Sequence, residues 1–159
     1  MSAQVTTHEV GFEPLDSLPG VDSLCVFVGE DERPLRGAAG FLDWRLGGAL
    51  SRVLVSGFFV GAPADTLLLP TGGRIAIPRV FAIGVGRWQT LTEEGLAAAM
   101  KTAAQVLDRA RAQSVALELP GAGVLQDSAR AQALKGSFLP AFAGARVAVL
   151  GEKGLGKIL

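Results

Sequence analysis

Residues 79–119 contain a strand, a helix and a second strand in immediate succession, and this unit constrains the fold more than any other part of the chain. An apolar run at 79–85 ends in a Gly-x-Gly turn, and a second apolar run follows at 114–119. Between the two, apolar residues recur every three or four positions, as in an amphipathic helix: Leu96, Met100, Ala103, Leu107 and Ala110. Two strands joined through a helix lie parallel with a right-handed crossover. The sequence therefore predicts an α/β protein in which strands 79–85 and 114–119 are parallel neighbours flanked by helices.

The remaining elements follow from shorter patterns of apolar residues and turn signals. A mixed sheet is expected, with a helix between the strands at 23–29 and 64–69. The predicted elements are strands at 5–12 and 23–29, one helix spanning Trp44 to Val53, a strand pair at 64–69 and 74–77 around the turn 70–73, a helix at 126–138 and a strand at 145–150.

Three stretches of the chain carry a resemblance to a known family. Residues 79–119, PLDSLPGVDSLCVFVGEDE and GAPADTLLLPTGGRIAIPRVFAIGVG together resemble the N-terminal domain of the leucyl (cytosol) aminopeptidases, over roughly residues 10–120. The resemblance implies a three-layer, macro-domain-like α/β fold with a mixed, mostly parallel sheet flanked by helices. In that family the two-metal peptidase chemistry belongs to a C-terminal domain with an Asn-Thr-Asp-Ala-Glu-Gly-Arg type motif, which does not occur in these residues. The resemblance thus implies an accessory domain without catalysis.

The composition agrees with one folded domain and limits the classes of partner that are expected. The chain has 159 residues, of which 49% are hydrophobic and 19% charged, and this predicts a single domain over 1–150 followed by a Gly/Lys-rich tail at 151–159. Fifteen basic residues balance fifteen acidic ones, so a nucleic-acid partner is not expected. The N-terminus has no signal-peptide pattern, and no apolar run approaches the ~20 residues of a membrane span. We therefore expect a cytoplasmic protein without a membrane partner.

Residues for catalysis or metal binding are sparse. The only cysteine, Cys25, lies within an apolar strand and is predicted to be a buried structural thiol. The only histidine, His8, has no second histidine or cysteine with which to share a metal. We predict neither a catalytic site nor a metal site, and five acidic residues are interpreted as solvated surface: Asp22, Glu30, Asp31, Glu32 and Asp43.

Two glycine-rich motifs suggest phosphate binding, but each is incomplete. Gly84 and Gly86 lie between a strand and a helix, where an anion can bind, but the favoured interpretation is a tight turn that needs permissive backbone angles. Residues 151–157 match G-x-x-x-x-G-K, but Ile158 replaces the hydroxyl residue that follows in a P-loop. The segment 29–50 lacks the Asn-Ala-Ala-Asn type sequence of macro domains that bind ADP-ribose, and its acidic residues at 30–32 would repel a pyrophosphate. No cofactor is therefore predicted.

Protein binding is the function class that remains, and two apolar segments support it. Residues 53–60 and 134–142 form either an exposed interaction patch or part of the core. The candidate partner contacts are Phe58, Phe59, Trp88, Phe138 and Phe142. Because the family's N-terminal domain packs on the catalytic domain within a hexamer, the resemblance implies a peptidase, held assembled or inhibited, or a second copy of the chain as partner. The alternatives are a nucleotide- or ADP-ribose-binding module and a small enzyme of macro-domain type.

Overall fold

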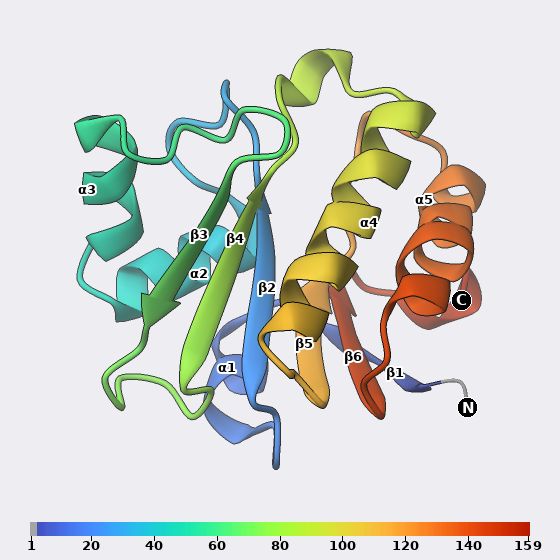
Figure 1. Cartoon of the computed structure of the whole chain (residues 1–159), viewed down its shortest axis with the longest axis horizontal. Coiled ribbons are helices and arrows are strands. Elements are labelled where there is room, and N and C mark those ends of the chain that lie inside the picture. The colour runs from blue at the N-terminus through green and yellow to red at the C-terminus, as the bar shows by residue number, and fades with distance from the viewer. Residues whose placement is uncertain (1–2) are drawn as a thin grey trace.

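The computed structural model describes residues 3–159 as a six-stranded sheet with helices on both faces (Figure 1). The strands are β1 (Gln4–Glu9), β2 (Ser23–Val28), β3 (Thr66–Pro70), β4 (Arg79–Gly84), β5 (Ser114–Glu118) and β6 (Arg146–Gly151). The α-helices are α1 (Phe12–Ser17), α2 (Gly37–Arg45), α3 (Ala49–Ser56), α4 (Glu93–Arg109) and α5 (Asp127–Ala133), and a π-helical turn at Leu134–Phe138 extends α5.

The strand order is β1-β6-β5-β2-β4-β3, and all neighbouring pairs are parallel except β3 and β4. This confirms the mixed, mostly parallel sheet. The predicted strands at 79–85 and 114–119 are parallel, but they are not neighbours, because β2 lies between them and pairs with both. The crossover through α4 therefore passes over β2. A βαβ pattern fixes the direction of its two strands and leaves room for a third between them.

Two apolar cores lie on opposite faces of the sheet and make the fold a three-layer structure. Side chains along β2 alternate between them, as the pleat of a strand requires. Cys25 and Phe27 pack with α4 and α5, whereas Leu24 and Val26 pack with α1, α2 and α3. Figure 1 shows α4 and α5 on the near face of the sheet, with α2 behind it.

The main helix forms where the periodicity predicts it. Thr92 caps α4, because its hydroxyl oxygen accepts a hydrogen bond from the Gly95 amide at 3.0 Å, and Glu93 places negative charge in the first turn. Leu96 and Met100 are fully buried in the core beneath the helix. The apolar stripe thus packs α4 onto the sheet.

The helix predicted from Trp44 to Val53 is instead two helices. Gly47 and Gly48 have φ angles of 63° and 82°, a left-handed conformation that ends α2. The Asp43 carboxylate then accepts hydrogen bonds from the amides of Leu50 and Ser51 and caps α3. The helical period continues across the break, so periodicity alone does not reveal it.

The predicted strand at 74–77 is wrong, because these residues form a loop. β3 pairs with β4 instead, with Leu67 opposite Ala82. The loop between them is closed by Thr71, whose hydroxyl donates to the Ile77 carbonyl at 2.6 Å. Ile77 is fully buried, so its apolar character reflects loop packing rather than a strand.

The segment at 151–159, predicted as a tail, packs against the domain. Gly151 is the last residue of β6, and Leu155 is buried in the core on the α4 side. A short 3-10 turn at Leu155–Lys157 takes the place of the helix that a P-loop requires. Among the described residues, no helix is long and apolar enough to cross a membrane.

Candidate functional site

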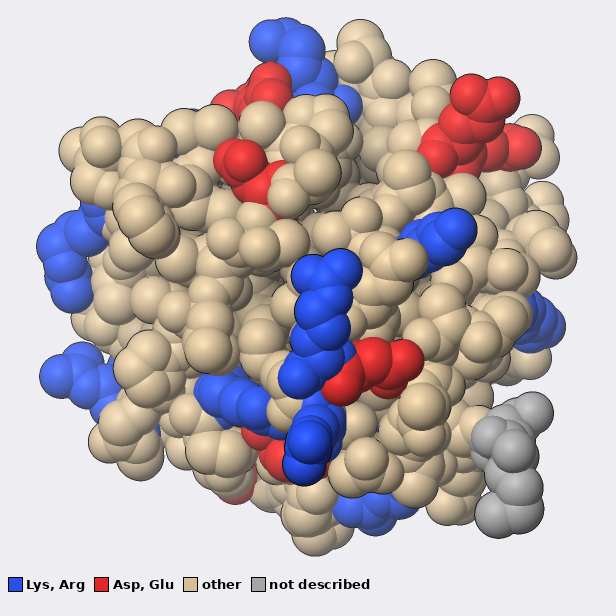
Figure 2. Space-filling view, viewed as in Figure 1, with Lys and Arg blue, Asp and Glu red and all other residues tan. Residues whose placement is uncertain are grey.

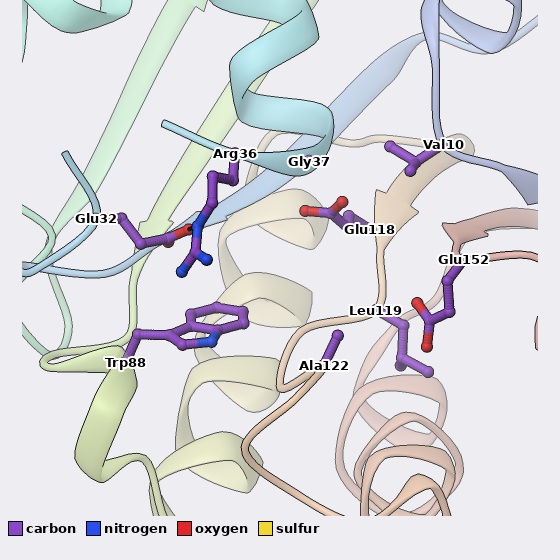
Figure 3. A pocket seen from close by; sticks show the side chains of 9 residues that line it. All are labelled: Val10, Glu32, Arg36, Gly37, Trp88, Glu118, Leu119, Ala122 and Glu152. Atoms are coloured by element: carbon purple, nitrogen blue, oxygen red, sulfur yellow. Dashed lines mark ion pairs between the residues drawn. The ribbon is translucent and has the colours of Figure 1, made fainter. Parts of the chain in front are cut away.

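A cavity of about 250 Å³ lies where three parallel strands end, which is the usual place for a ligand in an open α/β sheet (Figure 3). β2, β5 and β6 point their carboxyl ends toward it, and α2 and the loop after β4 close its sides. The cavity is lined by Val10, Glu32, Arg36, Gly37, Trp88, Glu118, Leu119, Ala122 and Glu152. It is thus bordered by three carboxylates, one guanidinium and one indole.

Glu118 occupies the amino-terminal end of α2. As the last residue of β5, it places its Oε2 atom 2.9 Å from the Ala38 amide, which donates to it. Gly37 makes this approach possible, because a Cβ atom at that position would overlap the Glu118 carboxylate. The positive end of a helix attracts anions, and in this protein the chain supplies the anion itself.

The surroundings of Glu118 make its negative charge costly. Burial raises the pKa of Glu118 to about 7, the nearby carboxylates of Glu32 and Glu152 add to the rise, and the Ala38 hydrogen bond and Arg130 oppose it. Glu118 therefore changes its charge near neutral pH, unlike an ordinary surface glutamate.

Glu32 is the second carboxylate of the cavity, and it is buried, with 7% of its surface exposed. Its Oε1 atom accepts a hydrogen bond from the Gly29 amide at 2.9 Å, and its Oε2 atom lies 3.9 Å from Nε of the mostly exposed Arg36. Burial raises the pKa of Glu32, while the Gly29 amide and Arg36 oppose the shift. The interpretation of Glu32 as solvated surface is therefore wrong: the loop after β2 folds it back toward the sheet.

Glu152 is fixed by a buried arginine. Arg130, on α5, is only 1% exposed, and it pairs with Glu152 and Asp127 and donates to the carbonyls of Leu119 and Pro120. Hydrogen bonding from Arg130 lowers the pKa of Glu152 against the opposing effect of burial. Arg130 thus ties the loop after β5 to the end of β6 and holds one wall of the cavity.

Trp88 forms the opposite wall and is held by Asp31. The Trp88 and Gln89 amides donate to the two Asp31 carboxylate oxygens at 2.6 and 3.1 Å. The indole is partly buried, packs against the core beneath α4 and borders the cavity (Figure 3). Asp31 therefore fixes the turn that presents Trp88.

The glycines proposed for anion binding have their amides already occupied. The Gly84 amide donates to the Asp65 carbonyl at 2.9 Å, and the Gly86 amide donates to the Gly61 carbonyl at 2.8 Å. Gly86 has a φ of 76°, as a tight turn requires. The tight-turn interpretation accounts for Gly86, whereas Gly84 is the last residue of β4 and lies against the backbone of Gly61 and Ala62. Neither amide is left to hold a phosphate.

The five candidate partner contacts differ in burial: three are buried, one is partly buried and one is exposed. Phe59, Phe138 and Phe142 lie in the two cores, so they are unavailable to a partner, and Trp88 is partly buried at the cavity. Phe58 is 82% exposed at the end of α3. Other large apolar side chains are also exposed: Trp44 at 77%, Val55 at 88% and Leu68 at 56%.

The described residues offer little for metal or nucleophilic chemistry. Between residues 3 and 159, no group of three or more His, Cys, Asp or Glu side chains is placed to hold a metal ion. Cys25 is fully buried, and burial raises the pKa of its thiol. His8 lies on β1 beside Thr6. Figure 2 shows one face of the molecule, on which basic and acidic side chains are scattered over a mostly uncharged surface.

Comparison with sequence families and known proteins identifies relatives of the chain. The model of the cytosol aminopeptidase family, N-terminal domain, matches residues 24–143. The "Probable cytosol aminopeptidase" of Geobacter sp. (strain M21) is 36% identical over 100 residues, which are 63% of this chain and 20% of that protein. The corresponding protein of Ralstonia pickettii (strain 12J) is 33% identical over 92 residues, or 57% of this chain and 18% of its own. The chain thus spans about a fifth of these relatives.

Solved structures show the same fold at low sequence identity. A tomato leucine aminopeptidase mutant aligns over 98% of this chain and 34% of its own, with a TM-score of 0.66 and 16% identity. The Trypanosoma brucei macrodomain in complex with ADP aligns over 98% of this chain and 66% of its own, with a TM-score of 0.74 and 11% identity. The DarG macrodomain of Mycobacterium tuberculosis aligns over 94% and 98%, with a TM-score of 0.71 and 15% identity. These matches confirm the macro-domain-like fold.

Proposed function

The chain belongs to the cytosol aminopeptidase family through its N-terminal domain, and from this we propose that it is a non-catalytic, protein-binding domain that regulates or scaffolds a partner. The observation that carries the proposal is the exposure of Trp44 on α2, Val55 on α3 and Phe58 just after α3. A few anchor residues that are buried by the partner, often aromatic ones such as Trp44, supply most of the binding energy in protein interfaces. We call these three residues the α2–α3 surface.

The end of α3 presents its apolar side chains in a defined geometry. Gly57, with a φ of 80°, ends the helix, and the Phe58 amide donates to the Ser56 hydroxyl oxygen at 3.2 Å. The backbone is thus held while the Val55 and Phe58 side chains remain in water. An apolar anchor on an ordered backbone loses little conformational entropy on binding.

A peptidase of the same family is the partner that we propose. In the curated relatives, the matched segment is about a fifth of a polypeptide named as an aminopeptidase. Interfaces between domains of one chain resemble those between separate proteins, so a domain of this family is suited to packing on such a peptidase. The bound peptidase would be held in an assembled or inhibited state, and the complex would form in the cytoplasm.

Nucleotide or ADP-ribose binding is the alternative function, and only the likeness of fold to macrodomains favours it. The charges of the cavity oppose it. A diphosphate at the start of α2 would have to displace Glu118 and approach Glu32 and Glu152. Three carboxylates around one site repel an anion.

The proposed function predicts a complex that depends on Phe58. The purified chain should release no product from a leucyl substrate, with or without added zinc or manganese. Mixed with a cytosol aminopeptidase from its own cell, it should co-elute in size-exclusion chromatography with light scattering. Phe58→Asp should weaken this complex at least tenfold, because it places a charge in an apolar contact. Gln105→Asp, an equal change of charge on the exposed side of α4, should leave the complex intact.

Two results would contradict the proposal. Metal-dependent hydrolysis by the pure chain would show that it is itself an enzyme. A monodisperse monomer in the presence of the aminopeptidase, with no other protein bound in lysate, would rule out protein binding as its role. The same light-scattering trace tests self-association, since a dimer lost in Phe58→Asp would identify a second copy as the partner.

A further inference from the structure

The cavity holds an acceptor atom that the protein leaves without a hydrogen bond. Only 8% of the Glu32 side chain is exposed, yet among the described residues none donates to its Oε2 atom. This oxygen has an ion pair at 3.9 Å with Nε of Arg36, whose side chain is 67% exposed. Glu32 lines the cavity, and no side-chain oxygen or nitrogen of the described residues is both fully buried and without a hydrogen bond, so this oxygen reaches solvent and is available to a donor that enters from there.

Glu118 faces the same space, and it too has one carboxylate oxygen to which no group of the described residues donates. Its Oε2 atom accepts from Ala38, whereas its Oε1 atom accepts from none of the described residues. The charged groups around it are Glu32 after β2, Glu152 after β6, Arg36 before α2 and Arg130 on α5. Arg130 forms ion pairs with Glu152 and Asp127, so it offsets the charge of Glu118 only in part.

Trp88 adds a wall suited to a positively charged group. An indole face attracts cations, and a guanidinium matches carboxylate oxygens through its fixed N–H donors. In Figure 3 the Arg36 guanidinium lies between Glu32 and Trp88, so the chain already places one such group at the edge of the cavity. A compact metal ion does not suit the site, because no three acidic or histidine side chains of residues 3–159 converge on one point.

We propose that this cavity binds an organic cation, a guanidinium or primary ammonium group, with Glu32 and Glu118 as acceptors and Trp88 as the wall. The group belongs either to a free small molecule or to an arginine or lysine side chain of a protein. The proposal is independent of the α2–α3 surface, and either can fail without the other.

The test is a titration followed by ¹H–¹⁵N NMR. The chain has two tryptophans, so two indole N–H signals report binding: Trp88 at the cavity and Trp44 as an internal control on α2. Methylguanidinium chloride tests the free compound, and a blocked Gly-Arg-Gly peptide tests the protein side chain, both at constant ionic strength. We expect saturable shifts of the Trp88 indole and the Ala38 amide at millimolar ligand, while the Trp44 signal stays fixed. Saturation by both ligands identifies the guanidinium itself as sufficient, and saturation by the peptide alone identifies a protein side chain.

Variants and pH separate binding from a structural role. Glu32→Gln and Glu118→Gln should each weaken binding roughly tenfold, because each removes a charged acceptor, and Glu94→Gln, an equal change in the exposed first turn of α4, should not. Affinity in the wild type should rise several-fold from pH 6 to pH 8 as Glu118 ionises, and this rise should vanish in Glu118→Gln. The proposal is overturned if neither ligand shifts Trp88 saturably, or if the double variant binds as tightly as the wild type.

Discussion

At the scale of single residues, the negative charge of Glu118 is unfavourable for folding but is needed to bind a cation in the cavity. The fold brings this carboxylate out of water and beside two others, and burial raises its pKa to about 7 from an ordinary value of 4.5. Raised carboxyl pKa values of this kind cluster at functional sites. The Ala38 amide donates a hydrogen bond to the Glu118 carboxylate, and the absence of a side chain at Gly37 leaves room for that carboxylate at the start of α2.

The raised pKa predicts that ionisation of Glu118 destabilises the fold. The contribution of Glu118 to stability should be greatest below pH 4.5, where the folded and unfolded states both hold the proton, and should be lost as pH rises through 7. Glu118→Gln removes this loss and retains an oxygen that can accept from Ala38. In urea unfolding at pH 8 it should raise the free energy of unfolding by about 1–3 kcal/mol, since each pKa unit is worth ~1.4 kcal/mol. At pH 4 the gain should disappear, and a variant that is less stable than wild type at pH 8 would refute this reasoning.

The sequence does not predict that the acidic residues of the cavity come together, although each of them lies near the end of an apolar run. Glu32 follows the apolar run at 23–29, Glu118 is the next-to-last residue of the run at 114–119, and Glu152 follows the run at 145–150. Acidic residues at the ends of several predicted strands indicate a shared edge once the strands are parallel. Which strands are adjacent depends on pairing between distant segments, and the burial of Glu32 depends on how the loop after β2 folds back.

At the scale of elements, the sequence predicts the regular parts of the chain and misses their junctions. Periodicity locates α4, and apolar runs locate β2, β4, β5 and β6, because one buried face imposes a repeat. The break between α2 and α3 depends on two glycines with positive φ, which interrupt the backbone without changing the apolar repeat. The loop at 74–77 looks like a strand because Ile75 and Ile77 are buried and alternate with exposed residues.

A substitution at Gly84 tests how closely the loop after α3 packs on β4. A Cβ atom at Gly84 would overlap the backbone of Gly61 and Ala62, so Gly84→Ala should lower the free energy of unfolding by about 1–3 kcal/mol or more. Gly11→Ala is the matched control, because that glycine is extended and a Cβ there meets no atom within 4 Å. It should change stability by less than ~0.5 kcal/mol. Equal urea midpoints for the two variants would contradict the packing described for this loop.

At the scale of the whole molecule, the fold is shared with macrodomains, but the charges of the cavity differ from those that a nucleotide needs. The amides of Gly84 and Gly86 are bonded within the chain, and the start of α2 holds Glu118. The apolar side chains of the α2–α3 surface remain exposed. The resemblance of sequence therefore predicted the architecture, while the choice between protein and nucleotide as ligand depends on side chains that the fold brings together.

A parallel calorimetric titration tests this choice most directly. The chain is titrated under identical conditions with a cytosol aminopeptidase from its own cell and with ADP-ribose. We predict saturable heat with the aminopeptidase, lost in Phe58→Asp, and no saturable heat with micromolar ADP-ribose. Saturable binding of ADP-ribose together with no heat from the aminopeptidase would contradict the account and establish the domain as a nucleotide-binding module.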